Sequence, residues 1–366
     1  MRVVSLSVRD FRCYDEARVT LGEGLTVVSG PNGAGKTNLL EAVYFGCTGR
    51  SCRTTNEREV VRFGQSATRV VVSAVSDDGA HELAVGFEPG QPKRMRADGA
   101  PVERLLDVSS RPLVSVFLPD RLELIKGPPS LRRAHVDQFV SAMWPARSAS
   151  RRGYAQALAQ RNALLARIRS GHATRDSLAT WDRQLAEYGL ALMHDRAQAV
   201  DAIAGSFGQL ATSLGLGADA EVLYRPRSRA TTPEELAQEL AERVDGDLER
   251  GFSGHGPHRD DLAAVHRGRD LRVYGSQGQQ RLALLALLLA ERAAIASERD
   301  AIPLMLLDDV MSELDRERRD ALVEVLRSHG QSVITTTDVE HVPTATDAGV
   351  TRLAVEDGRV REEAVV

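Results

Sequence analysis

The stretch that decides the fold of this chain is Gly30-Pro31-Asn32-Gly33-Ala34-Gly35-Lys36-Thr37. It fits the pattern G-x-x-x-x-G-K-[ST] of a phosphate-binding loop. The β-branched apolar run 25–29 precedes it and the helix-forming run 38–45 follows it, which predicts a buried strand, the loop and then a helix. Glycines let backbone N–H groups converge on a phosphate, and the start of the helix adds positive potential.

The motif gives its last residues separate roles. Lys36 is expected to reach the β- and γ-phosphates of a nucleotide, and Thr37 to hold Mg²⁺. We therefore predict that the eight loop residues and the adjacent Asn38 bind nucleotide, with Mg²⁺ as the metal.

Composition indicates a globular protein and gives no sign of a membrane segment. The chain has 366 residues, 42% of them apolar and 27% charged, with a formal net charge of −4. The chain as a whole is not basic, so its net charge does not indicate binding to nucleic acid. The longest apolar run, 282–290, is too short to cross a bilayer. The cysteines Cys13, Cys47 and Cys52 form no metal or disulfide pattern, and their scarcity suits a reducing cytoplasm.

The order of predicted elements indicates an α/β body interrupted by helices. Strands are expected at 3–8, 17–21, 25–29, 70–75, 82–87, 94–102 and 113–118. Helices are expected within 131–215, with breaks at Pro145, Gly171-His172 and Gly205, and at 233–248. Strands at 261–266, 271–274, 304–307 and 332–336 then alternate with helices at 279–297 and 315–328. We predict a nucleotide-binding lobe made of 1–128 and 251–366, split by a helical insertion, 129–250.

A second part of the site is predicted where an apolar strand ends in two carboxylates. The run Pro303-Leu304-Met305-Leu306-Leu307 leads into Asp308 and Asp309. A strand-end Asp can hold the Mg²⁺ shell, so Asp308 joins Thr37 as a predicted metal ligand. Asp309 could orient or deprotonate an attacking water. Lys36, Asp308 and Asp309 are thus the candidate catalytic residues.

The late part of the chain resembles the ABC-type ATPases. The run Ser276-Gln277-Gly278-Gln279-Gln280-Arg281 is similar to their signature motif, and Met311-Ser312-Glu313-Leu314-Asp315 looks like their D-loop. Within that superfamily the chain resembles the RecF family of bacterial recombination mediators. The stretches that carry this resemblance are 10–14, 49–54, 117–120, 127–129, 132–133, 256–261 and 335–338.

The resemblance implies an SMC-like ABC ATPase head without the long coiled coil. Such proteins form an ATP-dependent homodimer in which each signature motif caps the nucleotide on the partner's phosphate loop. It implies that ATP is the nucleotide, and that Arg12, Ser276, Gly278, Gln279 and Thr337 also bind it. It further implies binding to double-stranded and gapped DNA, and cooperation with RecR and RecO in loading RecA.

Three departures from the superfamily pattern predict slow hydrolysis. Asp309 stands where ABC transporters carry a catalytic Glu, so its carboxylate lies one methylene further back. The Q-loop glutamine position is Leu118, and the H-switch histidine position is Thr337 or a neighbour. A hydroxyl can hydrogen-bond a γ-phosphate but is a poor base near neutral pH. These departures indicate a timer or clamp.

Two groups of arginines are candidate DNA contacts. Arg50 and Arg53 follow the phosphate-loop helix, and Arg132 and Arg133 begin the helical middle. Contact with phosphate groups is one interpretation, and a solvated helix or loop surface is the other. Two further functions stay open: the nucleotide-binding subunit of an ABC transporter, and another SMC-like repair ATPase head.

Overall fold

The structure is a computed structural model that describes residues 1–118, 122–299, 301–328 and 330–363. It divides into two compact units. The first unit is Met1–Arg121 with Ile295–Val366, and the second is Leu122–Ala294. The second unit therefore contains the whole predicted insertion and also residues 251–294. The reason is strand pairing, because β10 (Asp261–His266) pairs antiparallel with β9 (Ala220–Arg225).

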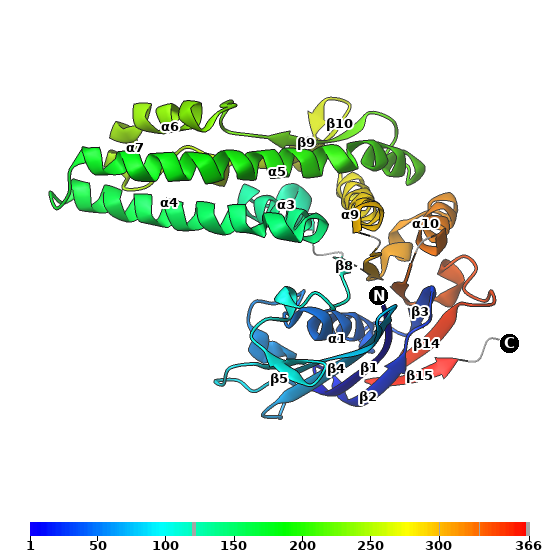
Figure 1. Ribbon diagram of the computed structural model, residues 1–366. Coiled ribbons are helices and arrows are strands. Elements are labelled where there is room, and N and C mark those ends of the chain that lie inside the picture. The colour runs from blue at the N-terminus through cyan, green and yellow to red at the C-terminus, as the bar shows by residue number, and fades with distance from the viewer. Residues whose placement is uncertain (119–121, 300, 329, 364–366) are drawn as a thin grey trace. The chain divides into compact units, whose positions relative to one another are not determined.

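The first unit contains two six-stranded sheets, and α1 (Lys36–Thr48) contacts strands of both (Figure 1). The first sheet is antiparallel, in the order β2-β1-β4-β5-β6-β7. Its strands are β1 (Arg2–Phe11), β2 (Tyr14–Thr20), β4 (Thr68–Ser76), β5 (Gly79–Phe87), β6 (Arg94–Ala97) and β7 (Ala100–Val102). We call it the antiparallel sheet.

The second sheet of this unit is mixed, in the order β15-β14-β3-β13-β12-β8. Its strands are β3 (Leu25–Ser29), β8 (Val114–Phe117), β12 (Leu304–Leu307), β13 (Ser332–Thr336), β14 (Thr351–Glu356) and β15 (Arg359–Glu363). All neighbours are parallel except β14 and β15. The carboxyl ends of β8, β12, β13 and β3 therefore meet at one edge, where ligand sites of parallel sheets form.

The core of the first unit forms around α1. Leu39, Leu40, Val43 and Phe45 of this helix are almost fully buried, and the Phe45 ring lies 5.6 Å from that of Phe11 between centroids. The remaining helical segments of the unit are α10 (Arg316–Ser328), η1 (Glu57–Val60), η2 (Leu105–Asp107), η7 (Val310–Glu313) and η8 (Val339–His341). The phosphate-binding loop thus joins two buried elements, β3 and α1, which hold it in place.

The second unit is mainly helical. Its helices are α2 (Glu123–Lys126), α3 (Pro129–Met143), α4 (Ser148–Arg169), α5 (Leu178–Ser213), α6 (Pro233–Glu242), α7 (Val244–Arg250), α8 (Leu271–Tyr274) and α9 (Gln277–Arg299), which ends in the first unit. Short 3-10 turns are η4 (Pro145–Arg147), η5 (Arg175–Ser177) and η6 (Pro257–Arg259). A three-stranded sheet, β11-β10-β9, includes β11 (Arg269–Asp270). Figure 1 shows α4 and α5 running side by side.

Buried charge holds α4, α5 and α7 together. The fully buried Arg161 of α4 donates to Asp182 of α5 at 2.6 Å and to Asp247 of α7 at 2.7 Å. A buried charge is tolerated only when it is paired and hydrogen-bonded, and both conditions hold here. Burial nevertheless raises the pKa of Asp182, because desolvation outweighs the hydrogen bond from Arg161.

Two sequence-based expectations about elements are wrong. The predicted break at Gly205 does not occur, because α5 continues through it to Ser213. A single glycine in a helix costs only about 1 kcal/mol, which the packing of a long helix can outweigh. The predicted strand 271–274 is the helical turn α8, since the Asp270 side chain accepts the Arg272 N–H and caps it. Strands β9, β11, β14 and β15 had no sequence-based prediction, and the region predicted as one helix, 233–248, forms two, α6 and α7.

Candidate nucleotide-binding and catalytic site

The candidate site lies at the carboxyl edge of the mixed sheet. The phosphate-binding loop follows β3, Asp308 follows β12 and Thr337 follows β13. These three strands are parallel neighbours in the order β3-β13-β12. The segments that follow them therefore lie together, although they come from distant parts of the chain.

Two glycines of the loop have backbone shapes and neighbours that exclude a side chain. Gly30 has φ +153°, and a Cβ there would lie 2.2 Å from the carbonyl oxygen of Val355. Gly35 has φ +119°, and a Cβ there would lie 2.7 Å from the Cys13 sulfur. These φ values suit glycine, so the motif's glycines are required by this packing.

Lys36 lies across the loop that the motif assigns to phosphate. Its Nζ donates to the carbonyl oxygens of Gly30 at 2.7 Å and Pro31 at 3.0 Å. Burial lowers the pKa of Lys36 below its ordinary value, and the nearby charges of Asp309 and Asp308 oppose that shift. The ammonium is therefore held beside both carboxylates and over the loop, where it can meet the β- and γ-phosphates.

Thr37 and Asp308 meet directly. The Thr37 hydroxyl lies 2.9 Å from each carboxylate oxygen of Asp308, and the Thr335 hydroxyl donates to Asp308 Oδ1 at 2.7 Å. A hydroxyl and a carboxylate are the hard oxygen donors that Mg²⁺ prefers. The predicted metal ligands are thus adjacent, and their chemistry fits Mg²⁺.

Asp309 follows in a left-handed backbone conformation, with φ 45°. Its N–H donates to Thr335 Oγ1 at 2.9 Å, so one hydroxyl contacts both Asp308 and Asp309. Left-handed conformations are uncommon outside glycine and are better tolerated by Asp and Asn. The Thr335 hydroxyl of β13 thus holds both Asp308 and Asp309 at the end of β12.

The other predicted hydrolysis residues differ in exposure. Thr337 is exposed just beyond the end of β13, whereas Leu118 is buried beyond β8. Pro119 and Asp120, which carried part of the family resemblance, lie outside the described residues, and so does the side chain of Glu313.

A buried carboxylate that sequence analysis missed connects three of the predicted residues. Glu41 of α1 is fully buried and accepts two hydrogen bonds from Arg12, at 2.9 and 2.7 Å. Arg53 lies 3.4 Å from Glu41 and donates to Asn38 Oδ1 at 2.8 Å. Bidentate Arg–carboxylate pairs fix geometry as well as charge. Glu41 therefore positions Arg12 beside the phosphate-loop helix, and a Glu among the apolar residues 39–43 was the available sequence signal.

The predicted signature residues belong to the second unit, at the start of α9. The Ser276 N–H donates to Gln279 Oε1 at 2.9 Å, and the Gln279 N–H donates to Ser276 Oγ at 3.2 Å. This reciprocal pair is a capping box. Ser276 and Gly278 are exposed, and Gln279 is half-buried. The helix start is thus well ordered and open to a ligand.

The predicted DNA contacts differ sharply in exposure. Arg132 is buried, with bidentate bonds of 2.7 and 2.8 Å to Asp261 and further bonds to backbone carbonyls. Its role is to join α3 to β10, so the expectation of a DNA contact is corrected. Arg133 is half-buried and donates to the Asp260 carbonyl at 2.7 Å, Arg53 belongs to the Glu41 cluster, and Arg50 is exposed.

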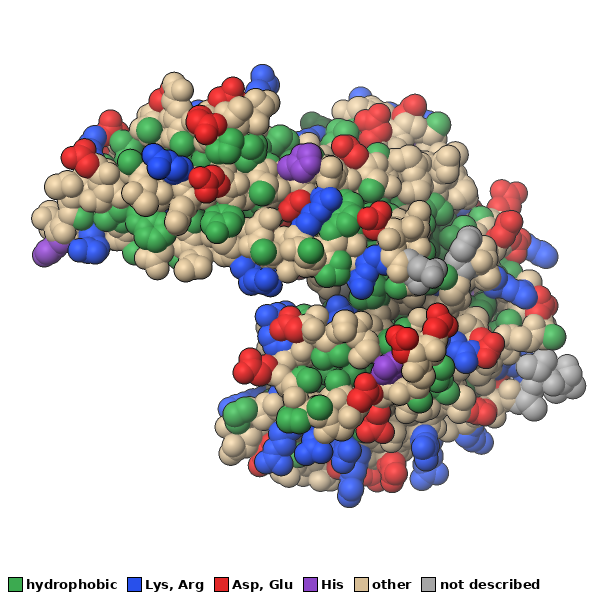
Figure 2. Space-filling view, in the orientation of Figure 1, with side chains coloured by type: hydrophobic (Ala, Val, Ile, Leu, Met, Phe, Trp, Pro, Cys, Tyr) green, Lys and Arg blue, Asp and Glu red, His purple; other side chains and the backbone are tan. Residues whose placement is uncertain are grey.

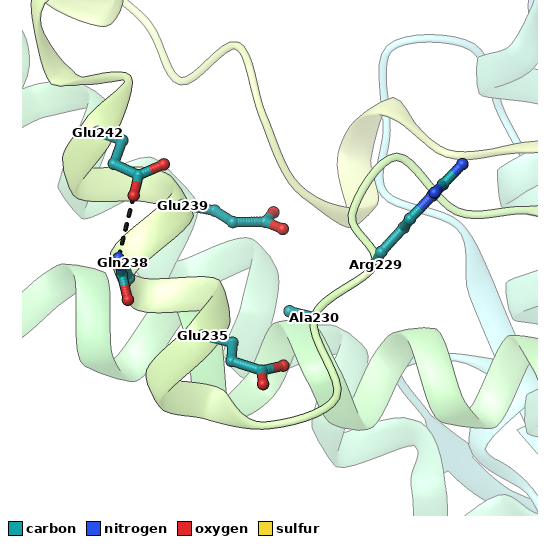
Figure 3. Close-up of a pocket in the computed structure, with 6 residues that line it drawn as sticks. All are labelled: Arg229, Ala230, Glu235, Gln238, Glu239 and Glu242. Carbon is teal, nitrogen blue, oxygen red and sulfur yellow. Dashed lines mark hydrogen bonds between the residues drawn. The ribbon is translucent and has the colours of Figure 1, made fainter.

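A pocket in the second unit contains none of the predicted site residues. Figure 3 shows Glu235, Glu239 and Glu242 of α6 around it, together with Arg229. Its carboxylates outnumber the one arginine, and this charge disfavours a phosphate ligand. Among the residues that the structure describes, no group of three or more His, Cys, Asp or Glu side chains could hold a metal ion. Nor does any helix within them have the length and apolarity to cross a membrane.

Comparisons with known proteins agree with this geometry. A family model described as an AAA domain matches residues 5–94. A protein of Heliobacterium modesticaldum named DNA replication and repair protein RecF is 35% identical over 347 residues, covering 93% of each chain. The protein of that name from Myxococcus xanthus is 36% identical over 373 residues, covering 98% of this chain and 97% of its own.

Solved structures give the same result for the fold. A structure described as recombination mediator protein RecF with ATP superposes with a TM-score of 0.86 at 29% identity, covering 99% of this chain and 98% of that one. The Smc head domain of Pyrococcus furiosus superposes with a TM-score of 0.60 at 16% identity, over 100% and 96%. The predicted fold, an ABC-type ATPase head with a mixed sheet, is confirmed, and the described residues contain no long coiled coil.

Proposed function

Because this chain belongs to the RecF family of DNA replication and repair proteins, we propose that it is an ATP-switched clamp on DNA in recombinational repair. Its curated relatives carry that name over nearly their whole length, and a solved relative is described as a recombination mediator in the RecFOR pathway. In this proposal the ATP-bound homodimer binds duplex or gapped DNA in the cytoplasm and acts with RecR and RecO to load RecA.

The observation that carries the proposal is the contact between Thr37 and Asp308, which brings the phosphate-binding loop and the strand-end carboxylates into one site. ATP is held by the loop residues 30–37, with Asn38, Arg12 and Thr337 at its borders. Thr37 and Asp308 are the residues that would hold Mg²⁺, which when bound supplies positive charge to the phosphates. Lys36 adds a second positive charge beside them.

Hydrolysis in this proposal is slow and resets the clamp. Asp309 orients or deprotonates the attacking water with a side chain one methylene shorter than glutamate. Thr337, at the end of β13, can hydrogen-bond a phosphate but is a poor proton acceptor. Leu118 cannot replace a glutamine that contacts water or metal. The ATPase activity therefore acts as a timer.

Dimerisation completes each site with the partner's Ser276, Gly278 and Gln279. The Ser276 and Gln279 N–H groups are used in the capping box, so the helix start offers the Gly278 N–H and the Ser276 hydroxyl to the γ-phosphate. Arg50, with Arg53 and Arg133 as weaker candidates, stays a proposed DNA contact. A transporter subunit is not favoured, since the full-length relatives are replication and repair proteins.

Light scattering with ATP, ADP and no nucleotide, with and without gapped duplex DNA, tests the proposal. We expect a dimer with ATP but not with ADP or without nucleotide. We also expect that this dimer binds DNA more tightly than the monomer does. ATP binding without either effect would contradict the clamp.

A further inference from the structure

The solvent-facing side of the antiparallel sheet carries a group of arginines with no assigned role. We call it the arginine face, and it consists of Arg9 on β1, Arg18 on β2, Arg69 on β4, and Arg94 and Arg96 on β6. All five are exposed. Figure 2 shows blue side chains, with red ones among them, along the lower edge of the first unit, where Figure 1 places strands of this sheet.

Strand register aligns these arginines in rows. Arg9 pairs with Arg69, Arg69 with Gly86, and Gly86 with Arg94, which gives one row across β1, β4, β5 and β6. A second row begins at Arg18 on β2 and ends at Arg96 on β6. Strands lie about 4.8 Å apart, so the face spans ~19 Å from β2 to β6.

The opposite side of the same strands explains why these side chains point to solvent. Val8, Val70 and Val85 alternate with the arginines and are buried in the core that includes α1. Because side chains alternate along a strand, the residues between them face away from the core. The residues between the arginines are short: Ser7, Val71 and Ala84 in one row and Gly86 in the other.

The charge of the arginine face is poorly compensated within the chain. Arg9 and Arg69 stand directly opposite each other, and like charges in that position destabilise a sheet. Among the residues the structure describes, Arg18, Arg69, Arg94 and Arg96 make no ion pair within 4.0 Å, and Arg9 makes a long one of 3.9 Å to Asp10. Glu16 and Glu82 are the acids on this face, two against five arginines.

We propose that the arginine face is a docking surface for the phosphate backbone of double-stranded DNA. This inference rests on the proposed clamp function and assigns its DNA contact to residues that sequence analysis did not select. Duplex DNA carries one charge per ~1.7 Å of its axis with both strands counted, so a ~19 Å length carries about eleven phosphates, and those on one side can face the sheet. Arginine suits them because its planar fork binds phosphate with two hydrogen bonds.

The composition of the face favours DNA over an acidic protein. Protein interfaces rely on buried aromatic and apolar anchors, and their cores are depleted of charge. Between the arginines lie Ser7, Val71 and Ala84 in one row and Gly86 in the other, so the two rows hold one half-buried valine and no aromatic residue. Interfaces with DNA are more polar and more positive, which is the character observed here.

The test is a triple variant, Arg9→Thr with Arg69→Thr and Arg94→Thr, in the full chain with ATP. Threonine favours strands, so the sheet should form. Binding to a duplex of random sequence is measured from 50 to 300 mM salt. Each lost phosphate contact should lower the slope of log K against log salt by about 0.9, and the three together by ~2.7, with affinity at least tenfold weaker.

Two controls make the result specific. Arg359→Thr, at an exposed position of β15 in the mixed sheet, removes one arginine charge elsewhere in the unit and should leave the slope within ~0.3 of the parent, against ~0.9 for one lost phosphate contact. The triple Lys variant at positions 9, 69 and 94 keeps the charge and should keep most of the slope. ATP-driven dimerisation should be unchanged in all three proteins.

The outcomes separate the two proposals. A triple Thr variant that dimerises with ATP and binds DNA with the parent's affinity and slope would overturn the arginine face alone. The same result, together with lost binding to an acidic partner protein, would assign the face to that protein and also overturn the DNA inference. A parent chain that shows no ATP-dependent DNA binding would remove the clamp function, and the inference with it.

Discussion

The hydroxyl of Thr37 lies 2.9 Å from both carboxylate oxygens of Asp308, although 271 positions separate the two residues in the chain. The parallel order β3-β13-β12 makes this contact possible, because it places the end of β12 near the start of α1. The contact joins the loop that binds phosphate to the carboxylates that follow a separate strand. The predictions below begin from it.

Asp308→Asn should weaken Mg²⁺-dependent ATP binding about tenfold, because the metal loses a charged ligand while the side-chain shape is kept. Binding of ATP in EDTA should change little. Calorimetric titration with and without Mg²⁺ measures both. Asp357→Asn, at an exposed turn with φ 47°, is the matched control and should behave as the parent does. An equal loss of ATP affinity with and without Mg²⁺ would argue against a metal role for Asp308.

Lys36→Met should lower ATP affinity by about tenfold to a hundredfold and abolish ATP-driven dimerisation, since it removes the charge held over the loop. Met has a similar length and is readily buried, so the fold should be retained. Nucleotide titration and light scattering measure the two effects. A variant that dimerises at normal ATP concentrations would refute the phosphate-loop assignment.

Asp309→Asn should slow hydrolysis roughly a hundredfold while ATP binding persists, because an amide cannot accept the proton of the attacking water. Asn tolerates the left-handed backbone at this position, so the turn after β12 should remain. Phosphate release and the lifetime of the DNA-bound dimer are the measurements. Unchanged turnover would transfer the water-positioning role to Glu313 or Thr337.

Ser276→Arg should leave ATP binding by the monomer intact but block dimerisation and DNA binding, because the cation occupies the place of the partner's γ-phosphate. Loss of the capping box costs about 1 kcal/mol in stability. Ser276→Ala shares that cost without the added bulk, so it separates capping from obstruction and should dimerise better than the Arg variant. If the monomer itself no longer binds ATP, the signature residues support their own unit's fold and the trans-site mechanism needs replacement.

The second unit should lose stability in mild acid through His258. Its Nε2–H donates to the Ser253 carbonyl at 2.8 Å, and its Nδ1 accepts the Tyr154 hydroxyl at 2.7 Å, so the ring is held neutral. Burial lowers the pKa of His258 from 6.5 to about 4. The unfolded chain therefore binds the proton first, and stability present above pH 6.5 falls by up to ~3 kcal/mol as pH drops towards 4.

The His258→Gln variant keeps one hydrogen-bond donor and one acceptor at this position. It should lose less stability than the parent between pH 6.5 and 4. Urea unfolding of both proteins at pH 7.5 and 4.5 gives the comparison. A parent and variant with the same acid-induced loss would show that other groups cause it.

Local sequence patterns were sufficient to predict several elements of this molecule. The loop 30–37 could be assigned because its glycines, lysine and threonine are specified by adjacent residues. Buried strands such as β3 and β12 are apolar along their whole length, and α6 begins at Thr232 and Pro233, a cap and first turn that the residues themselves indicate. These features depend on neighbours in the chain, so they can be read without tertiary structure.

Contacts between distant segments were decided only by the tertiary structure. Arg12 pairs with Glu41, and Arg132 with Asp261, so one arginine lies beside the phosphate-loop helix and the other is a buried link between α3 and β10. Neither sequence neighbourhood distinguishes these outcomes. Strand register likewise brings Arg9 opposite Arg69 across 60 positions of chain, and a shift of one residue in either strand would turn that strand's arginine towards the core. The chain encodes which groups are present, and the packing and pairing of distant strands and helices decide which of them meet.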